Sequence, residues 1–200
     1  MVKRCFDFFC SLMGMMILLP LFLIIAFWIR KDSAGPVFFR QIRIGKNGVP
    51  FRIHKFRTMK VGSENRGQLT IGQDSRITRS GFFLRKYKLD ELPQLIDVFA
   101  GKMSLVGPRP EVPAFVEFYP ETVRKKILSV KPGITDMASI HMIDENRILA
   151  AYKEPQKAYV DVILPQKQGY YLKYVDDHSL KLDIKIIFLT IFKIFKNRDS

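Results

Sequence analysis

The longest hydrophobic pattern in the chain is the apolar segment from Phe6 to Ile29, which holds one charge, Asp7. As a helix, this segment would reach about 36 Å, enough to cross a hydrocarbon core of roughly 30 Å. Pro20 lies near its middle and removes a helix hydrogen bond, so we expect a bend there. No small-x-small cleavage pattern follows, which argues against a cleaved signal peptide.

Basic residues flank this segment on both sides, with Lys3 and Arg4 before it and Arg30 and Lys31 after it. Because the flanks are balanced, the positive-inside bias does not choose an orientation. Two geometries stay open: a kinked transmembrane helix, or a helix that bends at Pro20 and returns both ends to the cytoplasm.

A second helical pattern runs from Leu180 to Lys196. It is mostly aliphatic and aromatic, and its lysines fall within one arc of about 120°; these are Lys181, Lys185, Lys193 and Lys196. The pattern is typical of a basic amphipathic helix in a lipid headgroup layer, and also of a core helix with a solvated lysine edge. Asp183 falls within the apolar face, where a carboxylate needs a partner. We expect a basic side chain of the globular domain.

Extended runs from Val37 to Ile44 and from Phe51 to Met59 are joined by Gly45-Lys46-Asn47-Gly48, which predicts a β-hairpin. The two runs are rich in basic residues, namely Arg40, Arg43, Arg52, Lys55 and Arg57. They indicate either a charged outer face or contact with phosphate or lipid. Little strand is expected elsewhere.

The polar stretch from Val61 to Ser75 predicts a loop beside the acidic pair described below, with a lid as one role for it. Helices are expected over Arg76–Tyr87, from Leu92 onward, over Glu121–Ser129 and over Glu145–Lys153.

In the helix from Leu92 onward, Leu92, Leu95, Ile96 and Phe99 follow helical spacing and predict a packed face. Gly101 suits its end. The stretch from Leu105 to Pro113 holds Gly107 and several prolines, which excludes a regular helix.

The chain has 200 residues, enough for one compact domain plus an anchor, divided at 1–31 and 32–200. Its 33 basic against 19 acidic residues give a net charge of +14, which favours a polyanionic partner such as nucleic acid, anionic lipid or a phosphorylated substrate. Cys5 and Cys10 lie at the anchor end and indicate no disulfide framework. The three histidines fit no zinc spacing, and ordinary hydrogen-bonded roles are expected for them.

The candidate chemistry lies at Asp90 and Glu91, just before a helix whose first turn holds Pro93. The helix dipole and the nearby Arg85 and Lys88 favour ionised carboxylates. A carboxylate of low pKa is a poor general base but can be a nucleophile toward phosphorus.

Its neighbour can hold Mg²⁺ together with substrate phosphate oxygens. Arg109, between Pro108 and Pro110, offers a planar fork for phosphate. Taken alone, the acidic pair is most often a helix cap and Arg109 a surface ion pair. Their combination with the membrane segments indicates phosphate chemistry at a membrane face.

At these residues the chain resembles the bacterial sugar transferase family, the monotopic polyprenyl-phosphate phosphoglycosyl transferases, in its short single-domain form. The matching pieces extend over nearly the whole chain. They are Lys3-Arg4 with Asp7, Pro20, Pro36-Val37-Phe38 with Arg40-Gln41, Lys55-Phe56-Arg57-Thr58-Met59, Leu89-Asp90-Glu91-Leu92-Pro93-Gln94, Met103-Ser104-Leu105-Val106-Gly107-Pro108-Arg109-Pro110, Lys131-Pro132-Gly133-Ile134-Thr135 and Ser179-Leu180-Lys181-Leu182-Asp183.

The resemblance implies an α+β, mostly helical fold. It implies a re-entrant membrane helix, a small hairpin and amphipathic interfacial helices around a compact cytoplasmic domain. Asp90 would be the nucleophile and, with Glu91, hold Mg²⁺. Arg85, Arg109, Lys55 and Arg57 would lie near bound phosphate.

The implied reaction moves a phosphosugar from a UDP-sugar to a polyprenyl phosphate, expected to be undecaprenyl phosphate, through a covalent intermediate on Asp90, with release of UMP. This would be the first membrane step of glycan assembly at the cytoplasmic face of the bacterial inner membrane. Membrane lipids would be partners and nucleic acid would not; whether the chain forms a homodimer stays open.

The chain departs from the family pattern after Thr135. Many members have Gly-Leu-Ala-Gln there and an arginine soon after, whereas this chain has Asp136-Met137-Ala138-Ser139. Arg147 is a candidate substitute for that arginine. Two other functions remain: a membrane-anchored basic module that binds anionic lipid or other polyanions without catalysis, and a phosphodiesterase that uses water as acceptor.

Overall fold

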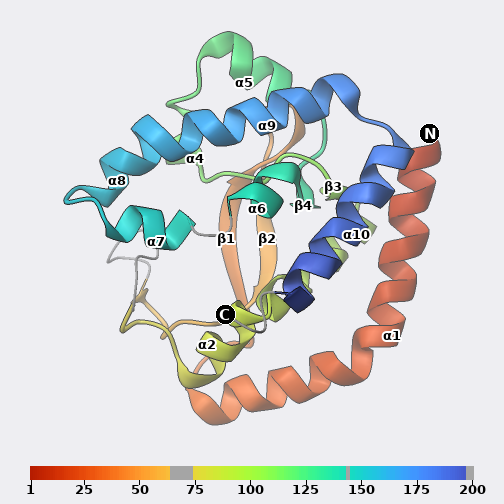
Figure 1. Cartoon of the computed structure of the whole chain (residues 1–200). Helices are drawn as coiled ribbons and strands as arrows, with labels where there is room; N and C mark the ends of the chain where they lie inside the picture. The colour runs from red at the N-terminus through yellow and green to blue at the C-terminus, as the bar shows by residue number, and fades with distance from the viewer. Residues whose placement is uncertain (64–73, 143–144, 197–200) are drawn as a thin grey trace.

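The computed structural model describes residues 1–63, 74–142 and 145–196. Its architecture is mostly helical, with helices surrounding one β-hairpin, as predicted (Figure 1). Helix α1 (Val2–Asp32) contains the whole apolar segment, with Pro20 in its interior. In Figure 1 this helix consists of two arms that meet at an angle and border the rest of the molecule on two sides. The predicted bend in the apolar helix is therefore present.

The predicted hairpin lies in the middle of the molecule (Figure 1). Strand β1 (Phe38–Ile44) pairs antiparallel with β2 (Pro50–Phe56), in a register that places Phe39 opposite Lys55. In the connecting turn, Asn47 has a φ of 58°, a left-handed conformation that asparagine tolerates better than most residues.

A smaller sheet joins β3 (Ser104–Val106) to β4 (Gly133–Thr135) in parallel. This pair is not predicted, because strands of three residues are too short to show an alternating pattern. Gly133 is required there, since a Cβ on it would lie 2.1 Å from the backbone nitrogen of Gly107. The stretch that follows β3 is irregular, as its glycine and prolines predict.

Helix α2 (Arg79–Lys86) begins at Arg79 and not at Arg76 as predicted. The Oγ1 of Thr78 accepts a hydrogen bond of 3.0 Å from the N–H of Gly81 and caps the helix, while Ile77 still pairs with an extended residue beyond β2. Residues 64–73 of the predicted polar loop lie outside the described residues, so the lid remains a prediction.

Helix α3 (Gln94–Phe99) buries Gln94, Asp97 and Val98. The predicted packed face is confirmed, but it packs on α1 and not in the core of the domain: Leu92, Leu95 and Ile96 are half-buried and Phe99 is exposed. In this contact, the ring of Phe99 stacks on that of Phe8 of α1, with centroids 4.9 Å apart. This short helix lies between α1 and the rest of the domain, and spacing alone does not show which of the two an apolar stripe will face. Gly101 follows with a φ of 79°, which confirms the predicted stop.

The C-terminal half is a series of helices around the main hydrophobic cluster, in which Tyr171, Ile163, Leu164 and Leu149 are each 1% exposed. The helices are α4 (Pro113–Val116), α5 (Glu121–Ile127), α6 (Met137–His141), α7 (Glu145–Ala150), α8 (Pro155–Ala158) and α9 (Leu164–Asp177), with a π-helical turn at Tyr159–Ile163. The predicted helices that begin at Glu121 and Glu145 are confirmed, with shorter ends.

Helix α10 (Leu180–Lys196) has the predicted bounds. Ile186 is fully buried in a cluster with Val106 and Tyr174, whereas Phe188 and Phe192 are 69% and 65% exposed. The helix therefore makes a core contact on one side and leaves an apolar surface open on another.

Asp183 of α10 is 1% exposed, and its partner differs from the expected one. Its carboxylate pairs with the Nζ of Lys3 and accepts a 2.7 Å hydrogen bond from the hydroxyl of Tyr174. The basic partner thus comes from the start of α1 and not from the globular domain. No local pattern reveals this pair, because it joins the two ends of the chain.

Candidate active site

Asp90 and Glu91 lie in a short 3₁₀ turn, Leu89–Glu91, between α2 and α3. Lys88 precedes the turn in a left-handed conformation, with a φ of 56°. Pro93 occupies the cap position of α3 rather than its first turn. Both acids are withdrawn from solvent, since Asp90 is 8% exposed and the Glu91 side chain 12% exposed. Two adjacent buried carboxyl groups require compensating positive charge.

Glu91 receives that charge from two distant parts of the chain. Lys55 of β2 donates to Oε1 at 2.7 Å. The guanidinium of Arg109 forms a fork on both carboxylate oxygens, with one bond of 3.0 Å to Oε2. Burial opposes ionisation of Glu91, but the charges of Arg109 and Lys55 outweigh it, so the pKa of Glu91 lies well below its usual value. Glu91 is therefore ionised at neutral pH.

Asp90 has a contrasting environment. No residue in the described part of the chain donates a hydrogen bond to its carboxyl group. Burial, and then the charge of Glu91, raise the pKa of Asp90, and the nearby Lys55, Lys88 and Arg85 offset this only in part. The expectation of a lowered pKa is therefore wrong for Asp90. It lies in a buried turn beside an ionised carboxylate and not on the free N–H groups of a helix terminus.

A clamp between α3 and β2 keeps Lys55 close to the acidic pair. Asp97 of α3 is fully buried and accepts a 2.8 Å hydrogen bond from the backbone N–H of His54, whose Nδ1 lies 2.8 Å from the other carboxylate oxygen. His54 is thus an ordinary hydrogen-bonded histidine, as predicted. Because His54 precedes Lys55 in β2, the clamp aligns that strand with the segment that carries Glu91.

Arg109 is positioned by a close crossing of two loops that the sequence places far apart. The N–H of Gly133 donates to the carbonyl oxygen of Pro108 at 3.0 Å, and the N–H of Gly107 donates to that of Thr135 at 3.1 Å. A Cβ on Gly107 would lie 2.4 Å from a backbone oxygen of the facing loop, so only glycine fits there. The two motifs that hold these glycines therefore act together to aim Arg109 at Glu91.

The two remaining arginines predicted for phosphate contact differ in position. Arg85 donates to the hydroxyl of Thr58 at 2.9 Å, and its charge acts on Asp90. Arg57 instead donates to three backbone carbonyl oxygens between Ser33 and Pro36, at 2.6 to 2.9 Å. Arg57 thus fastens the segment after α1, and the geometry gives its predicted phosphate contact no support.

Two charged residues near Arg109 were not among the predicted site residues. Arg43 of β1 donates to the carbonyl oxygen of Pro110 at 3.0 Å and so supports the loop that carries Arg109. Asp136 is 2% exposed and caps α6, and its charge acts on Arg109. The sequence pointed to Arg43 only as one of several basic residues in the predicted strands. It pointed to Asp136 only because many family members have glycine at that position.

The donor chemistry of the acidic pair fits Mg²⁺. This ion takes one or two carboxylates and completes its shell with phosphate oxygens and water. Among the described residues, no three side chains of His, Cys, Asp or Glu gather at one point, so a metal here would depend on substrate oxygens. The buried Asp90 and the ionised Glu91 are the residues that would hold it.

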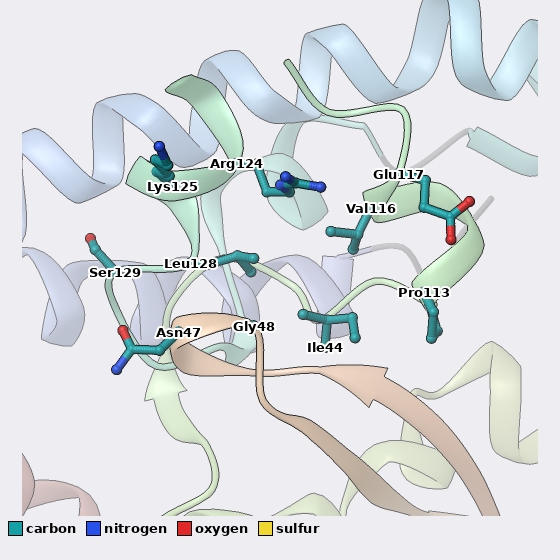
Figure 2. A pocket seen from close by; sticks show the side chains of 10 residues that line it. All are labelled: Ile44, Asn47, Gly48, Pro113, Val116, Glu117, Arg124, Lys125, Leu128 and Ser129. Atoms are coloured by element: carbon teal, nitrogen blue, oxygen red, sulfur yellow. The ribbon is translucent and has the colours of Figure 1, made fainter. Parts of the chain in front are cut away.

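A groove of about 490 Å³ lies apart from the acidic pair, between the hairpin turn and helices α4 and α5 (Figure 2). Its walls combine apolar side chains such as Ile44 and Leu128 with the basic Arg124 and Lys125. None of the predicted site residues lines it, so this groove gives no support to the candidate chemistry.

Comparison with known proteins identifies relatives along nearly the whole chain. The family model described as bacterial sugar transferase matches residues 1–197. The chain is 36% identical over 203 residues to the UDP-glucose:undecaprenyl-phosphate glucose-1-phosphate transferase of Escherichia coli, covering 99% of this chain and 41% of that protein.

Two further relatives differ in length. The UDP-N-acetylgalactosamine-undecaprenyl-phosphate N-acetylgalactosaminephosphotransferase of Aeromonas hydrophila is 36% identical, over 95% of this chain and 43% of its own length. The uncharacterized sugar transferase EpsL of Bacillus subtilis is 35% identical, over 96% of this chain and 87% of its own. The chain thus spans less than half of the two relatives with named substrates. The extent of the family match and these identities show that the chain belongs to the bacterial sugar transferase family.

Proposed function

We propose that this protein transfers a phosphosugar from a UDP-sugar to a polyprenyl phosphate, producing a polyprenyl diphosphosugar and UMP. The observation that carries the proposal is the unequal environment of the acidic pair. Glu91 is held ionised by Lys55 and Arg109, whereas the adjacent Asp90 is buried and accepts no hydrogen bond from the residues that the structure describes. The names of the Escherichia coli and Aeromonas relatives, which specify undecaprenyl phosphate and UDP-sugars, support the same substrate classes.

In the first proposed step, a carboxylate oxygen of Asp90 bonds to the β-phosphorus of the donor. The bond from that phosphorus to the bridging oxygen breaks, and UMP leaves with that oxygen. A raised pKa makes the ionised carboxylate of Asp90 more basic than an exposed one, and therefore a better nucleophile. Arg109, Lys55 and Arg85 would orient the diphosphate and stabilise its charge.

In the second step, an oxygen of the polyprenyl phosphate bonds to the phosphorus, and the bond to Asp90 breaks and frees the carboxylate. Bound Mg²⁺ would offset the negative charge of the phosphates, held by Glu91 and Asp90. The clamp between Asp97 and His54 keeps Lys55 in place during both steps.

Acceptor-dependent release of UMP tests this function. We would supply the protein in nanodiscs with Mg²⁺, a panel of UDP-sugars and undecaprenyl phosphate, and measure UMP. We expect continued release only when the acceptor is present, with one donor preferred. Release at the full rate without acceptor would identify a phosphodiesterase, and no release with any donor would contradict the transferase function.

A non-catalytic module that binds polyanions is less well supported. Such a surface needs cations that face the solvent. The side chains of Lys55 and Arg109 are only 16% and 26% exposed, and both are bonded to Glu91. Lys55 and Arg109 therefore neutralise Glu91 rather than form a solvent-facing basic surface, and we propose no nucleic-acid partner.

We also propose that α1 enters and leaves the membrane at the same face. At its start, Asp7 accepts hydrogen bonds from the hydroxyl of Ser104 at 2.8 Å and from the N–H of Leu105 at 3.0 Å, and Lys3 pairs with Asp183. These contacts fix the first turns of α1 to the globular domain.

The other end of α1 is fixed to the same domain. Asp32 accepts hydrogen bonds of 2.7 Å from both the N–H and the hydroxyl of Ser80, and Arg57 holds the carbonyl oxygens that follow. A helix that crossed the bilayer would place about 30 Å of hydrocarbon between its ends and would break one set of contacts. A bent, re-entrant helix keeps both.

Lipid contact follows from what α1 leaves exposed. Between its anchored ends it presents apolar side chains that are each more than half exposed, including Phe9, Met13, Met16, Ile17, Leu23, Ile24 and Phe27. The helix is also long and apolar enough to enter a membrane. We propose that lipid covers it and that Phe188 and Phe192 of α10 lie in the headgroup layer. The catalytic domain would then lie at the cytoplasmic face of the bacterial inner membrane.

Cysteine labelling tests this topology. In a Cys10→Ser background, Cys5 is exposed near the start of α1, and Ala34→Cys adds an exposed thiol after its end. A membrane-impermeant maleimide is expected to label both thiols in sealed inside-out vesicles and neither in right-side-out vesicles. Labelling of one thiol from each side would show a crossing helix.

A further inference from the structure

Asp136 lies where the two parallel strands end, beside the loop that carries Arg109. The register of β3 and β4 pairs Val106 with Thr135, and the N–H of Gly107 donates to the carbonyl oxygen of Thr135 at 3.1 Å. The carboxyl ends of parallel strands meet at the same edge of a sheet. The segment that leads from β3 to Arg109 and the residue Asp136, which follows β4, therefore begin at the same edge. Asp136 is 2% exposed. The fold therefore places a second buried carboxylate near the guanidinium that already holds Glu91.

The contacts of Asp136 suit its ionised form. One carboxylate oxygen accepts the N–H of Ser139 at 2.9 Å, and the other accepts the Ser139 hydroxyl at 2.5 Å. Burial raises the pKa of Asp136 above its usual value, and these hydrogen bonds together with the charges of Arg109 and Lys167 offset that effect only in part. No direct hydrogen bond joins Asp136 to Arg109, both of which the structure describes. Asp136 therefore acts on Arg109 through its charge.

We infer that Asp136 determines how tightly the site holds a nucleotide phosphate, and that its negative charge keeps the binding of UMP weak enough for release. This inference rests on the proposed function. The charge of Asp136 attracts Arg109 but repels a phosphate that Arg109 binds. Buried charges are only weakly screened by salt, so the repulsion persists at physiological ionic strength.

The cations of the site explain why a negative charge that opposes phosphate binding is useful. Lys55, Arg85, Lys88 and Arg109 all act on the acidic pair. These four cations outnumber the two carboxylates, so UMP, which carries between one and two negative charges near neutral pH, would still be attracted to them. Product release limits the turnover of many enzymes. A fixed carboxylate beside Arg109 lowers the affinity for the product without occupying the phosphate position.

The variant Asp136→Asn separates charge from structure. Asparagine caps a helix about as well as aspartate, so the contact with the Ser139 N–H is retained while the charge is lost. We would measure the dissociation constant of UMP by calorimetry on the full chain in nanodiscs, with EDTA present so that only protein groups contribute. We expect UMP to bind roughly 3 to 10 times more tightly. The turnover rate with saturating donor, acceptor and Mg²⁺ should fall.

Two controls define the cause. Ser139→Ala removes the hydroxyl contact but keeps the charge, and is expected to leave UMP affinity unchanged or weaker. Uridine, which has no phosphate, is expected to bind equally to the wild type and to Asp136→Asn. A purely structural role for Asp136 predicts weaker UMP binding in the variant, the opposite sign.

Equal or weaker UMP binding by Asp136→Asn, with an unchanged unfolding temperature, would overturn the inference. If that variant does not fold, Asp136→Ser, which also caps a helix, answers the same question. A wild-type protein that binds no UMP and releases none from any donor would refute the proposed function, and this inference with it. If the wild-type protein is active but Asp136→Asn binds UMP no more tightly than the wild type, only the inference about Asp136 is refuted and the proposed function stands.

Discussion

Asp90→Asn is expected to abolish turnover, with a loss of more than about a thousandfold, and to leave the fold intact. The amide is not a nucleophile toward phosphorus, so no covalent phosphosugar can form. The substitution breaks no hydrogen bond among the described residues, and it removes a charge that the neighbouring Glu91 repels. Intact-mass measurement after incubation with Mg²⁺ and the preferred UDP-sugar should show a phosphosugar adduct on the wild type and none on the variant.

Glu91→Gln is the matched comparison for this experiment. It keeps the nucleophile but loses the ion pairs to Lys55 and Arg109. We expect its adduct to form slowly rather than not at all, and its unfolding temperature to fall. A full adduct on Asp90→Asn would contradict a covalent mechanism at Asp90, whatever its turnover.

Asp183→Ala is expected to destabilise the protein by about 3 kcal/mol and to free the start of α1. Asp183 is 1% exposed and joins Lys3 to the hydroxyl of Tyr174. Its removal takes the charged acceptor from both groups and leaves them to share the carbonyl oxygen of Val106. Chemical unfolding in detergent should show the loss of stability. Limited proteolysis should show faster cleavage near the N-terminus.

Lys185→Ala provides the control on the same helix. Its side chain is exposed, so we expect a change within about 0.5 kcal/mol and no altered proteolysis. An Asp183→Ala protein that unfolds at the wild-type denaturant concentration would show that the contact between the two ends of the chain contributes nothing to stability.

Several elements could be predicted because the information that specifies them is local. The hairpin follows from two extended runs around Lys46 and Asn47, and α10 from its repeating apolar positions. The bounds of α2 were less accurate, because Thr78 caps the helix only where Ile77 continues a strand-like pairing. Spacing also did not show that the stripe ending at Phe99 faces α1 rather than the core.

The candidate site was predictable in composition but not in arrangement. The sequence identified Asp90, Glu91 and Arg109 as one chemical group, and the structure brings the last two into direct contact. It also grouped Arg57 with them, whereas that side chain binds backbone oxygens after α1. Asp136 could not be assigned a role until the pairing of β3 and β4 placed it near Arg109.

By itself, the sequence determined the long apolar helix with its bend, the hairpin, the C-terminal helix and the identity of the acidic pair. Each depends on residues that are close together in the chain. Only the tertiary structure decided which cation meets which carboxylate, and hence that the pKa of Glu91 is lowered while that of Asp90 is raised. The physical reason is that charge interactions and the cost of burial depend on distances in space, and Lys55, Glu91 and Arg109 come from separate segments that only packing brings together.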